Sequence, residues 1–429
     1  MIAEIADRWG TPAYLYDLAE IRRAHAELRE ALPQPSRLYY SLKANPHPAI
    51  AAELARLGCH AEVSSVGEFS TAVQAGFAAD RILLTGPGKP AQQVAATIAL
   101  GARRFSVDSP HDLAQVGAVA AAAGEQVDVL LRVNADAAVP GMGLSMAGVG
   151  SAFGADASWI ESAPERFLDS GGARVRGLHF YMGTQLEDVG LLLRQFRTSL
   201  ELGRQLMLRY GAAITEIDLG GGFAAPFART GDRGDLTGLR AGLLTELSQH
   251  LPDWRQQLPL VSFESGRFLT AAAGTLVCTV LDVKPSKDRV FVVLDAGIHQ
   301  LGGMSGLRRV PRIAPDLLPV PGPPRGWMDR CSVVGPLCTP LDTWTSGVRL
   351  PELKPGDLVA VPNVGAYGLT ASLLGFIGHL PAVEVVHDGG VLVSATRLVL
   401  GRRPVAADPA PAPARPAYAM SRLDGSEPR

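Results

Sequence analysis

Eight short apolar runs alternate with stretches rich in alanine and leucine between about residues 20 and 262. Strand-length runs that alternate with helix-length segments predict parallel βαβ units. Eight such strands close on themselves as a (β/α)8 barrel, whose ligands bind at the carboxyl ends of the strands. The predicted strands are 37–42, 60–64, 81–85, 103–107, 127–134, 175–180, 214–219 and 259–263. The predicted helices are 18–31, 46–57, 66–76, 90–100, 109–123, 186–209 and 237–250.

The pattern changes after residue 265, where short β-rich runs are separated by Gly, Pro and Asp. These runs predict a second, all-β domain. They are 277–283, 289–294, 358–361, 382–386 and 390–399. The predicted fold class is therefore α/β, a (β/α)8 TIM-like barrel plus a C-terminal all-β domain. Residues 140–156, rich in Gly, Ser and Met, predict a long active-site loop, and the Pro- and Ala-rich residues 404–429 predict a disordered tail.

Composition narrows the class of protein. A chain of 429 residues with 47% hydrophobic and 19% charged residues is typical of a globular enzyme with a large core. A net charge of −2 argues against a nucleic-acid partner, which needs a basic surface. The four cysteines have no metal-ligand spacing, so we expect no metal site and reduced thiols in the cytoplasm. No run is long enough to cross a membrane, and residues 1–10 lack the apolar segment of a secretory signal.

Residues that carry chemistry follow the predicted strands in order. Lys43 closes the first strand, and a desolvated lysine can lose its proton and attack an aldehyde. A lone lysine is more often an ordinary exposed residue, so a catalytic role for Lys43 depends on the other residues near it. Those companions lie at the ends of later strands: Glu62 and Ser64 after the second, Arg132 at the fifth, Tyr181 at the sixth, Gly220–Gly222 at the seventh and Glu264 at the eighth. Since these ends meet at one face of a barrel, the sequence predicts a single site there.

Seven motifs in a fixed order support this interpretation. With the segment Tyr39–Pro46, they resemble the barrel-type (fold type III) pyridoxal-phosphate-dependent decarboxylases, the diaminopimelate and ornithine decarboxylase family. The motifs are Glu62–Glu68, Leu131–Asn134, His179–Gln185, Asp218–Phe223, Glu264–Arg267, Gly335–Asp342 and Gly365–Gly368, and the resemblance spans about residues 10–400. It implies that Pro12–Asp17 joins the β domain. The predicted domains are thus a cofactor-binding barrel at 18–264 and a β domain built from 1–17 and 265–403.

The resemblance implies pyridoxal 5′-phosphate as the cofactor. Lys43 would form the Schiff base with its aldehyde, and Glu264 would bond the ring nitrogen, which strengthens the ring as an electron sink. The alternative for Glu264 is an ion pair with Arg267. The glycines at 220–222 would bring backbone N–H groups close to the phosphate. The other residues implied to contact the cofactor are Glu62, Ser64, Arg132, Thr184, Gly266, Arg267 and Tyr367.

One departure from the family concerns the residue that stacks on the cofactor ring. The family's stacking histidine falls at Tyr181 in this chain. A tyrosine ring can stack, although it cannot carry the charge of imidazole. His179 lies two residues earlier and therefore faces the same side of the strand. Either His179 compensates for the missing histidine or it is an ordinary core histidine.

A second departure concerns the substrate. Cys338 matches the cysteine that enters from the partner subunit and protonates the substrate carbon, which implies a homodimer with shared active sites. The family commonly has Asp or Glu next, to bind a distal ammonium, but here the residue is Thr339. Asp342 matches the ornithine-type enzymes. Arg308 and Arg309, in a loop at 295–309 that differs from the diaminopimelate pattern, would hold a distal carboxylate or phosphate, or are simply a solvated pair.

The sequence therefore predicts decarboxylation of the α-carboxylate of an L-amino acid, either free or held on a carrier protein, in secondary metabolism. Lys43, Cys338 and Glu264 are the predicted catalytic residues. Three alternatives stay open at this point. They are diaminopimelate decarboxylase in lysine biosynthesis, an amino-acid racemase on the same fold, and an inactive regulatory homologue. A racemase would have arginine in place of Glu264, and an inactive homologue would have no need to retain Lys43 and Cys338.

Overall fold

The computed structural model describes residues 2–135, 144–145, 150–302, 313–323, 326–402 and 404. All its helices and strands belong to one compact unit that ends at Leu398. Arg308 and Arg309, residues 140–143 and 146–149 of the predicted 140–156 loop, and nearly all of the predicted tail lie outside the described residues. None of the helices in the described part combines the length and apolar character needed to span a bilayer.

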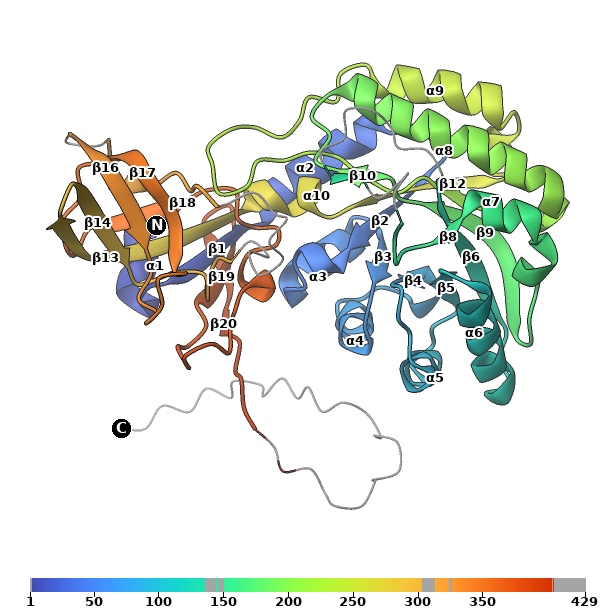
Figure 1. The fold of residues 1–429 in the computed structure, drawn as a ribbon, viewed down its shortest axis with the longest axis horizontal. Coiled ribbons are helices and arrows are strands. Elements are labelled where there is room, and N and C mark those ends of the chain that lie inside the picture. Colours follow the sequence, from blue (N-terminus) through green and yellow to red (C-terminus); the bar gives the residue numbers. More distant parts are fainter. Residues whose placement is uncertain are drawn as a thin grey trace. The chain divides into compact units, whose positions relative to one another are not determined.

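Eight parallel strands form a closed barrel (Figure 1). Their order is β5-β4-β3-β2-β12-β11-β9-β6, and pairing of β5 with β6 closes the ring. The strands are β2 (Arg37–Ser41), β3 (His60–Val63), β4 (Ile82–Leu84), β5 (Arg104–Val107), β6 (Val127–Asn134), β9 (Ala173–Phe180), β11 (Glu216–Asp218) and β12 (Leu260–Ser265). Three two-residue strands are not part of this ring of eight. They are β7 (Leu144–Ser145), β8 (Ala155–Asp156) and β10 (Gly183–Thr184). The eight predicted barrel strands are thus confirmed in order and direction.

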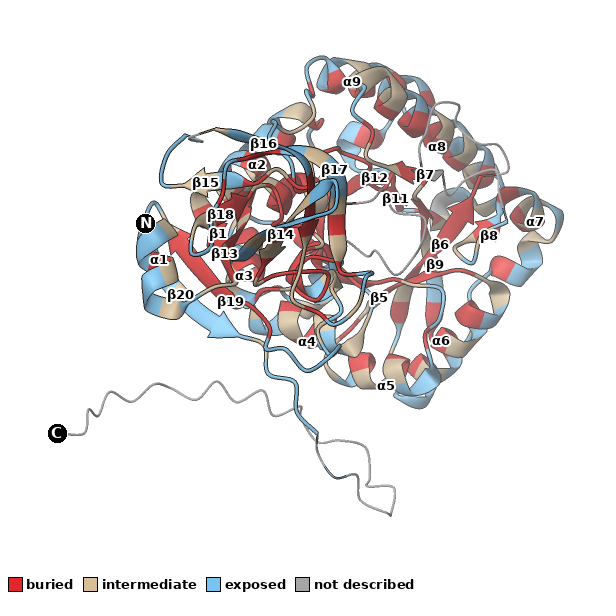
Figure 2. Ribbon diagram, turned by 60° about the vertical axis from the view of Figure 1, so that its left-hand side comes forward, coloured by how far each residue is buried: buried red, intermediate tan, exposed pale blue. Residues whose placement is uncertain are grey.

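Helices follow the barrel strands, and Figure 2 shows their buried faces turned toward the strands. Local signals start them: the Ser65 and Ser109 hydroxyls accept the first-turn amides of α4 and α6, and Pro48 opens α3. The helices are α2 (Leu18–Ala31), α3 (Pro48–Arg56), α4 (Val66–Gln74), α5 (Ala91–Ala99), α6 (Pro110–Ala122), α7 (Ala157–Ser162), α8 (Val189–Tyr210), α9 (Leu239–His250) and α10 (Arg267–Thr270).

The second sheet has the order β17-β16-β14-β13-β1-β19-β20, with β18 paired to β13 and β15 paired to β18. β1 (Ala13–Asp17) pairs antiparallel with β13 and parallel with β19, so the N-terminal piece joins the C-terminal strands as expected. The other strands are β13 (Gly274–Ser286), β14 (Arg289–Leu294), β15 (Leu318–Val320), β16 (Trp327–Val334), β17 (Thr343–Pro351), β18 (Leu358–Val361), β19 (Val383–Asp388) and β20 (Val391–Arg397). The boundaries at 17/18 and 264/265 stay a prediction.

Four elements of this part of the fold were not anticipated, namely α1 (Ile2–Trp9), β15, β16 and β17. β16 and β17 carry charged and exposed residues, and irregular register between them breaks the alternation that marks a strand.

An apolar layer crosses the inside of the barrel. Tyr39, Leu83 and Leu130 form a separate buried cluster, and they come from the alternate strands β2, β4 and β6. Layers built from alternate strands are typical of such barrels. Above this layer, toward the carboxyl ends of the strands, the inward side chains are polar, and they position the site described next.

Candidate active site

Lys43 lies in a short turn, η1 (Leu42–Ala44), directly after β2, and Glu62 lies on the neighbouring strand β3. The Lys43 ammonium donates to both Glu62 carboxylate oxygens, each at 3.0 Å. The Thr85 hydroxyl donates to the same buried carboxylate at 2.6 Å. Desolvation acts to lower the pKa of Lys43, but attraction to Glu62 and Glu264 outweighs it and raises that pKa. The ion pair with Glu62 therefore favours the charged form of Lys43.

A buried polar group surrounds Glu264 on β12. Glu264 Oε1 lies 3.2 Å from Nε2 of His179, and Nδ1 of His179 lies 2.8 Å from the Ser106 hydroxyl. Atoms of His179, Asp218 and Glu264 that can hold a ligand lie within 4.8 Å of one another. Burial, with the charge of Glu264, raises the pKa of Asp218 well above its ordinary value.

Three atoms of this group lack a hydrogen bond although they are buried: Glu264 Oε1, His179 Nε2 and Asp218 Oδ2. Buried polar atoms in native proteins normally have partners, so such a cluster indicates a ligand atom next to them. In the described residues, no ion pair joins Glu264 to Arg267. The ring nitrogens of His179 face Ser106 and Glu264, which leaves Tyr181 as the candidate for stacking. The Arg132 guanidinium lies 5.9 Å from the Tyr181 ring centroid and 4.8 Å from that of Phe153.

The glycines after β11 leave no room for side chains. A Cβ at Gly220 would lie 2.3 Å from the Phe180 carbonyl oxygen, and one at Gly221 would lie 2.5 Å from that of Glu264. Gly220 and Gly222 also have φ of +71° and +115°, in the left-handed region that favours glycine. The segment is therefore bare backbone, packed against the strands that carry Tyr181 and Glu264, as an anion-binding nest requires.

Arg267 and Tyr367 complete this side of the site. The Arg267 guanidinium lies 4.7 Å from the centre of the Tyr367 ring, and its buried Nε has no hydrogen-bond partner. Tyr367, with φ of +55°, donates its amide to the Ala44 carbonyl at 2.7 Å, which places it next to the Lys43 turn. Gly266 packs closely there, since a Cβ would lie 2.7 Å from that of Ala44.

Two further predicted residues lie beside these groups. The Ser64 hydroxyl lies 3.2 Å from that of Thr85, which itself bonds Glu62. Thr184 hydrogen-bonds Tyr181, and this bond opposes the effect of burial, which raises the pKa of Tyr181.

The predicted protonating residue, Cys338, is exposed on the loop between β16 and β17. No hydrogen bond or ion pair among the described residues joins it to the groups above. Asp342 closes this loop: its buried carboxylate accepts the Ile298 amide at 2.8 Å and the Leu337 amide at 2.9 Å. The Thr339 hydroxyl accepts the Leu341 amide at 3.3 Å. Asp342 therefore supports the loop from inside, a different place from the substrate contact predicted for it.

Sequence reasoning missed Thr85, Ser106 and Asp218. Thr85 directly follows the apolar strand β4, and Ser106 and Asp218 lie in β5 and β11. Ser106 and Asp218 also stand two residues from another polar inward position on the same strand, Arg104 and Glu216. That period of two was the signal that could have found them.

The comparisons with known proteins agree with this geometry. A family model, "Pyridoxal-dependent decarboxylase, pyridoxal binding domain", matches residues 18–271. The chain therefore belongs to the pyridoxal-dependent decarboxylases, which are lyases, and its cofactor is pyridoxal 5′-phosphate.

Among the particular relatives, the chain is 32% identical over 395 residues to the L-glutamyl-(BtrI acyl-carrier protein) decarboxylase of Niallia circulans, with 91% of each chain covered. It is 33% identical over 405 residues to the diaminopimelate decarboxylase of Actinosynnema pretiosum subsp. auranticum, covering 90% of this chain and 86% of the relative. Its fold is similar to that of Helicobacter pylori diaminopimelate decarboxylase complexed with L-lysine, with a TM-score of 0.79 and 27% identity over 92% of this chain and 95% of the other.

The residues present fit the cofactor. The glycine segment and the unpartnered Arg267 Nε suit the phosphate, the unpartnered Glu264 Oε1 suits the protonated ring nitrogen, and Lys43 suits the aldehyde. A carboxylate rather than arginine near the ring nitrogen also favours decarboxylation over racemisation.

Proposed function

We propose that the chain decarboxylates an aminoacyl group held on an acyl-carrier protein, in secondary metabolism. One observation carries this proposal: the described loop at 335–342 offers no free carboxylate for a distal ammonium. Residue 339 is a threonine, and the buried Asp342 carboxylate is already held by two backbone amides. A free diamino acid would leave its ammonium unpaired there, which costs several kcal/mol when the charge is buried.

A carrier-bound substrate satisfies the chemistry of the site. Loss of the α-carboxylate requires a free α-amine for the cofactor and a free α-carboxylate to leave. The carrier must therefore be joined to the amino acid through its side chain, so the distal group is an uncharged acyl group. The similarity to a decarboxylase that acts on an L-glutamyl carrier supports this class of substrate.

The bound cofactor supplies an electron sink for the pair of electrons left behind by carbon dioxide. The residues of this chain would then act as follows. Lys43 would hold the aldehyde carbon, and Glu62 would orient Lys43 and balance its charge through the 3.0 Å contacts. Glu264 would place its carboxylate at the ring nitrogen, next to the buried Asp218 carboxyl, whose pKa is raised by burial and by the charge of Glu264. Arg267 and the glycine segment would fix the phosphate, and Tyr181 would cover one face of the ring.

Protonation of the substrate carbon would come from Cys338 of a second copy of the chain. The Cys338 thiol is exposed. Apolar side chains on the same loop and on the segment between β18 and β19 are exposed as well. Leu341 is 77% exposed, Phe376 45% and Leu380 69%. Exposed apolar side chains mark a protein interface where they lie together in one patch. These features support a homodimer whose active sites are shared.

The test is carbon dioxide release from a panel of free amino acids and of aminoacyl carriers. We expect release from a side-chain-linked glutamyl carrier, and at least about a hundredfold less from free lysine, ornithine and meso-diaminopimelate. Thr339→Glu should raise activity toward the diamino acids. Thr245→Glu, which adds the same charge to an exposed position on α9, is the matched control. Efficient turnover of free diaminopimelate by the unmodified enzyme would refute the proposal and favour a role in lysine biosynthesis, to which the 33% identity with a diaminopimelate decarboxylase points.

A further inference from the structure

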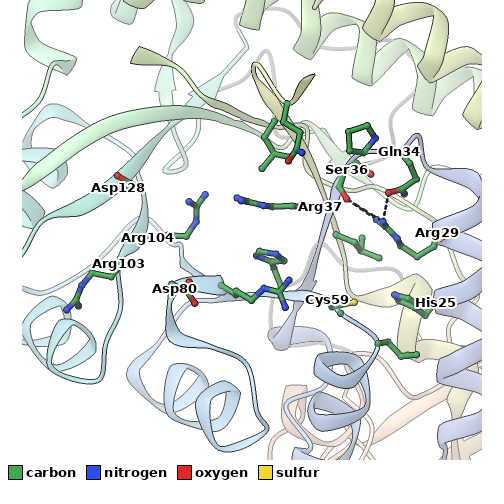
Figure 3. Close-up of a pocket in the computed structure, with 18 residues that line it drawn as sticks. His25, Arg29, Gln34, Ser36, Arg37, Cys59, Asp80, Arg103, Arg104 and Asp128 are labelled. Atoms are coloured by element: carbon green, nitrogen blue, oxygen red, sulfur yellow. Dashed lines mark hydrogen bonds between the residues drawn. The ribbon is translucent and has the colours of Figure 1, made fainter. Parts of the chain in front are cut away.

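A cavity of about 570 Å³ lies at the amino ends of the barrel strands, opposite the cofactor site (Figure 3). We call it the floor cavity, and its basic lining residues are His25, Arg29, Arg37, His60, Arg81, Arg103 and Arg104. Arg37, His60 and Arg104 are the first residues of β2, β3 and β5. The apolar layer of Tyr39, Leu83 and Leu130 lies next along the strands, so the floor cavity is separate from the site around Lys43.

The positive charge of the floor cavity exceeds the negative charge that its partners supply. Arg37 and Arg104 share a single carboxylate oxygen of the buried Glu216. Arg29 donates only to neutral oxygens, those of the Ser36 backbone and the Gln34 side chain. The Arg81 guanidinium has no hydrogen bond or ion pair among the residues that the structure describes, although its backbone amide bonds the Ala78 carbonyl.

Acidic groups offset only part of this charge. Asp80 and Asp128 also line the cavity, and Arg103 pairs with Glu125 at 2.6 Å. The arginines also act on His60. Burial, followed by the charges of Arg37 and other arginines of the cavity, lowers the pKa of His60 to about 3.

Buried polar atoms on the wall lack partners. His60 is only 8% exposed, and its Nδ1 has no hydrogen bond. Arg104 Nε and the Ser36 hydroxyl are buried without partners as well. The ion pairs with Glu216 explain why Arg37 and Arg104 are present at this end of the barrel. They do not explain the presence of Arg29, Arg81 or the unpartnered His60. Buried polar atoms are normally satisfied, so these indicate a ligand.

We propose that the floor cavity binds a small multivalent oxyanion, a metabolite that carries phosphate or several carboxylate groups. Guanidinium groups bind such oxyanions through paired N–H donors, and the cavity-lining Arg29 and Arg81 have no carboxylate partner among the described residues (Figure 3 shows Arg29). The volume suits a small metabolite, since ligand sites commonly measure about 300–1,000 Å³.

The experiment is calorimetric titration of the enzyme saturated with pyridoxal phosphate, so that the phosphate site near Lys43 is filled. Sodium pyrophosphate and sodium citrate are the two probes, each at an ionic strength fixed with sodium chloride. We expect at least one of them to bind. Arg81→Gln should weaken its binding about tenfold, the usual value of a charge-assisted contact. Because Arg81 is exposed and unpaired, this variant should fold normally.

Arg209→Gln is the matched control, because it removes the same charge from an exposed position on α8 that does not line the cavity. Its affinity should equal that of the unmodified enzyme. Binding of pyrophosphate alone assigns the ligand to phosphate esters, and binding of citrate alone assigns it to polycarboxylates. Failure of both anions to bind, or equal affinity in Arg81→Gln and Arg209→Gln, would overturn the proposal.

Discussion

A single methyl group at Gly221 should weaken cofactor binding. The Cβ of Gly221→Ala would lie 2.5 Å from the Glu264 carbonyl oxygen, closer than such atoms approach in proteins. Gly221 does not have a positive φ, so alanine can adopt its backbone conformation. The lack of space for the Cβ is therefore what opposes the substitution. Relief of the contact requires that the glycine segment move away from β12, which also moves its N–H groups from the phosphate position. Overpacking of this kind costs about 1–3 kcal/mol. That range corresponds to roughly 5- to 150-fold in a dissociation constant.

The assay is titration of the apoenzyme with pyridoxal phosphate, followed by visible absorbance, together with a thermal melt. Gly88→Ala is the matched control, because Gly88 has no atom within 4 Å of the added Cβ and no positive φ. We expect the control to keep the affinity of the unmodified enzyme. If Gly221→Ala keeps both its affinity and its melting temperature, the close packing of this segment has no role in cofactor binding and the reasoning fails.

Three further predictions follow from the structure. The purified enzyme should be yellow and lose its visible band on treatment with borohydride, and Lys43→Ala should bind the cofactor without that band; a band that persists in the variant would exclude Lys43 as the bonding amine. Mixed Lys43→Ala and Cys338→Ala subunits should regain activity, up to about a quarter of that of the unmodified enzyme if sites are shared and subunits mix at random, whereas a fully active monomer would rule out sharing. Burial raises the pKa of Glu384 to about 7, despite a hydrogen bond from Tyr16, so the folded state keeps a proton that the unfolded state releases near its ordinary pKa of 4.5. Stability should therefore fall as pH rises from about 4.5 to about 7, and thermal melts of Glu384→Gln should show a flatter dependence over that window.

The barrel could be predicted from the sequence because its strands are buried on both faces and read as apolar runs between clear helix signals. The same logic failed for β16 and β17. Their exposed residues, such as Trp327, Asp329 and Arg349, hide the alternation, and the bulges shift its phase. The strand that the N-terminal piece adds to the second sheet, β1, came from the family resemblance and not from its own pattern.

The site could be predicted as a set of residues but not as a set of contacts. Lys43 and Glu62 were both expected near the cofactor, yet their ion pair depends on how two neighbouring strands align. The ion pairs of Arg37 and Arg104 with Glu216 form only when the whole barrel closes, since the three residues are far apart in the sequence. The buried position of Asp342 depends on Ile298, which no local pattern connects to it.

The contact between Tyr367 and the Lys43 turn links cofactor binding to the folding of the entire chain. The Tyr367 amide bonds the Ala44 carbonyl, and the Asn45 side chain bonds the Gly365 carbonyl at 2.8 Å. A fragment that ends with the barrel would keep Lys43 and Glu264 but lose this side of the pocket. Any ligand that binds only the complete pocket stabilises both parts together, by an amount that grows with its concentration. The supply of cofactor would then govern how long the whole enzyme survives, as well as how fast it works.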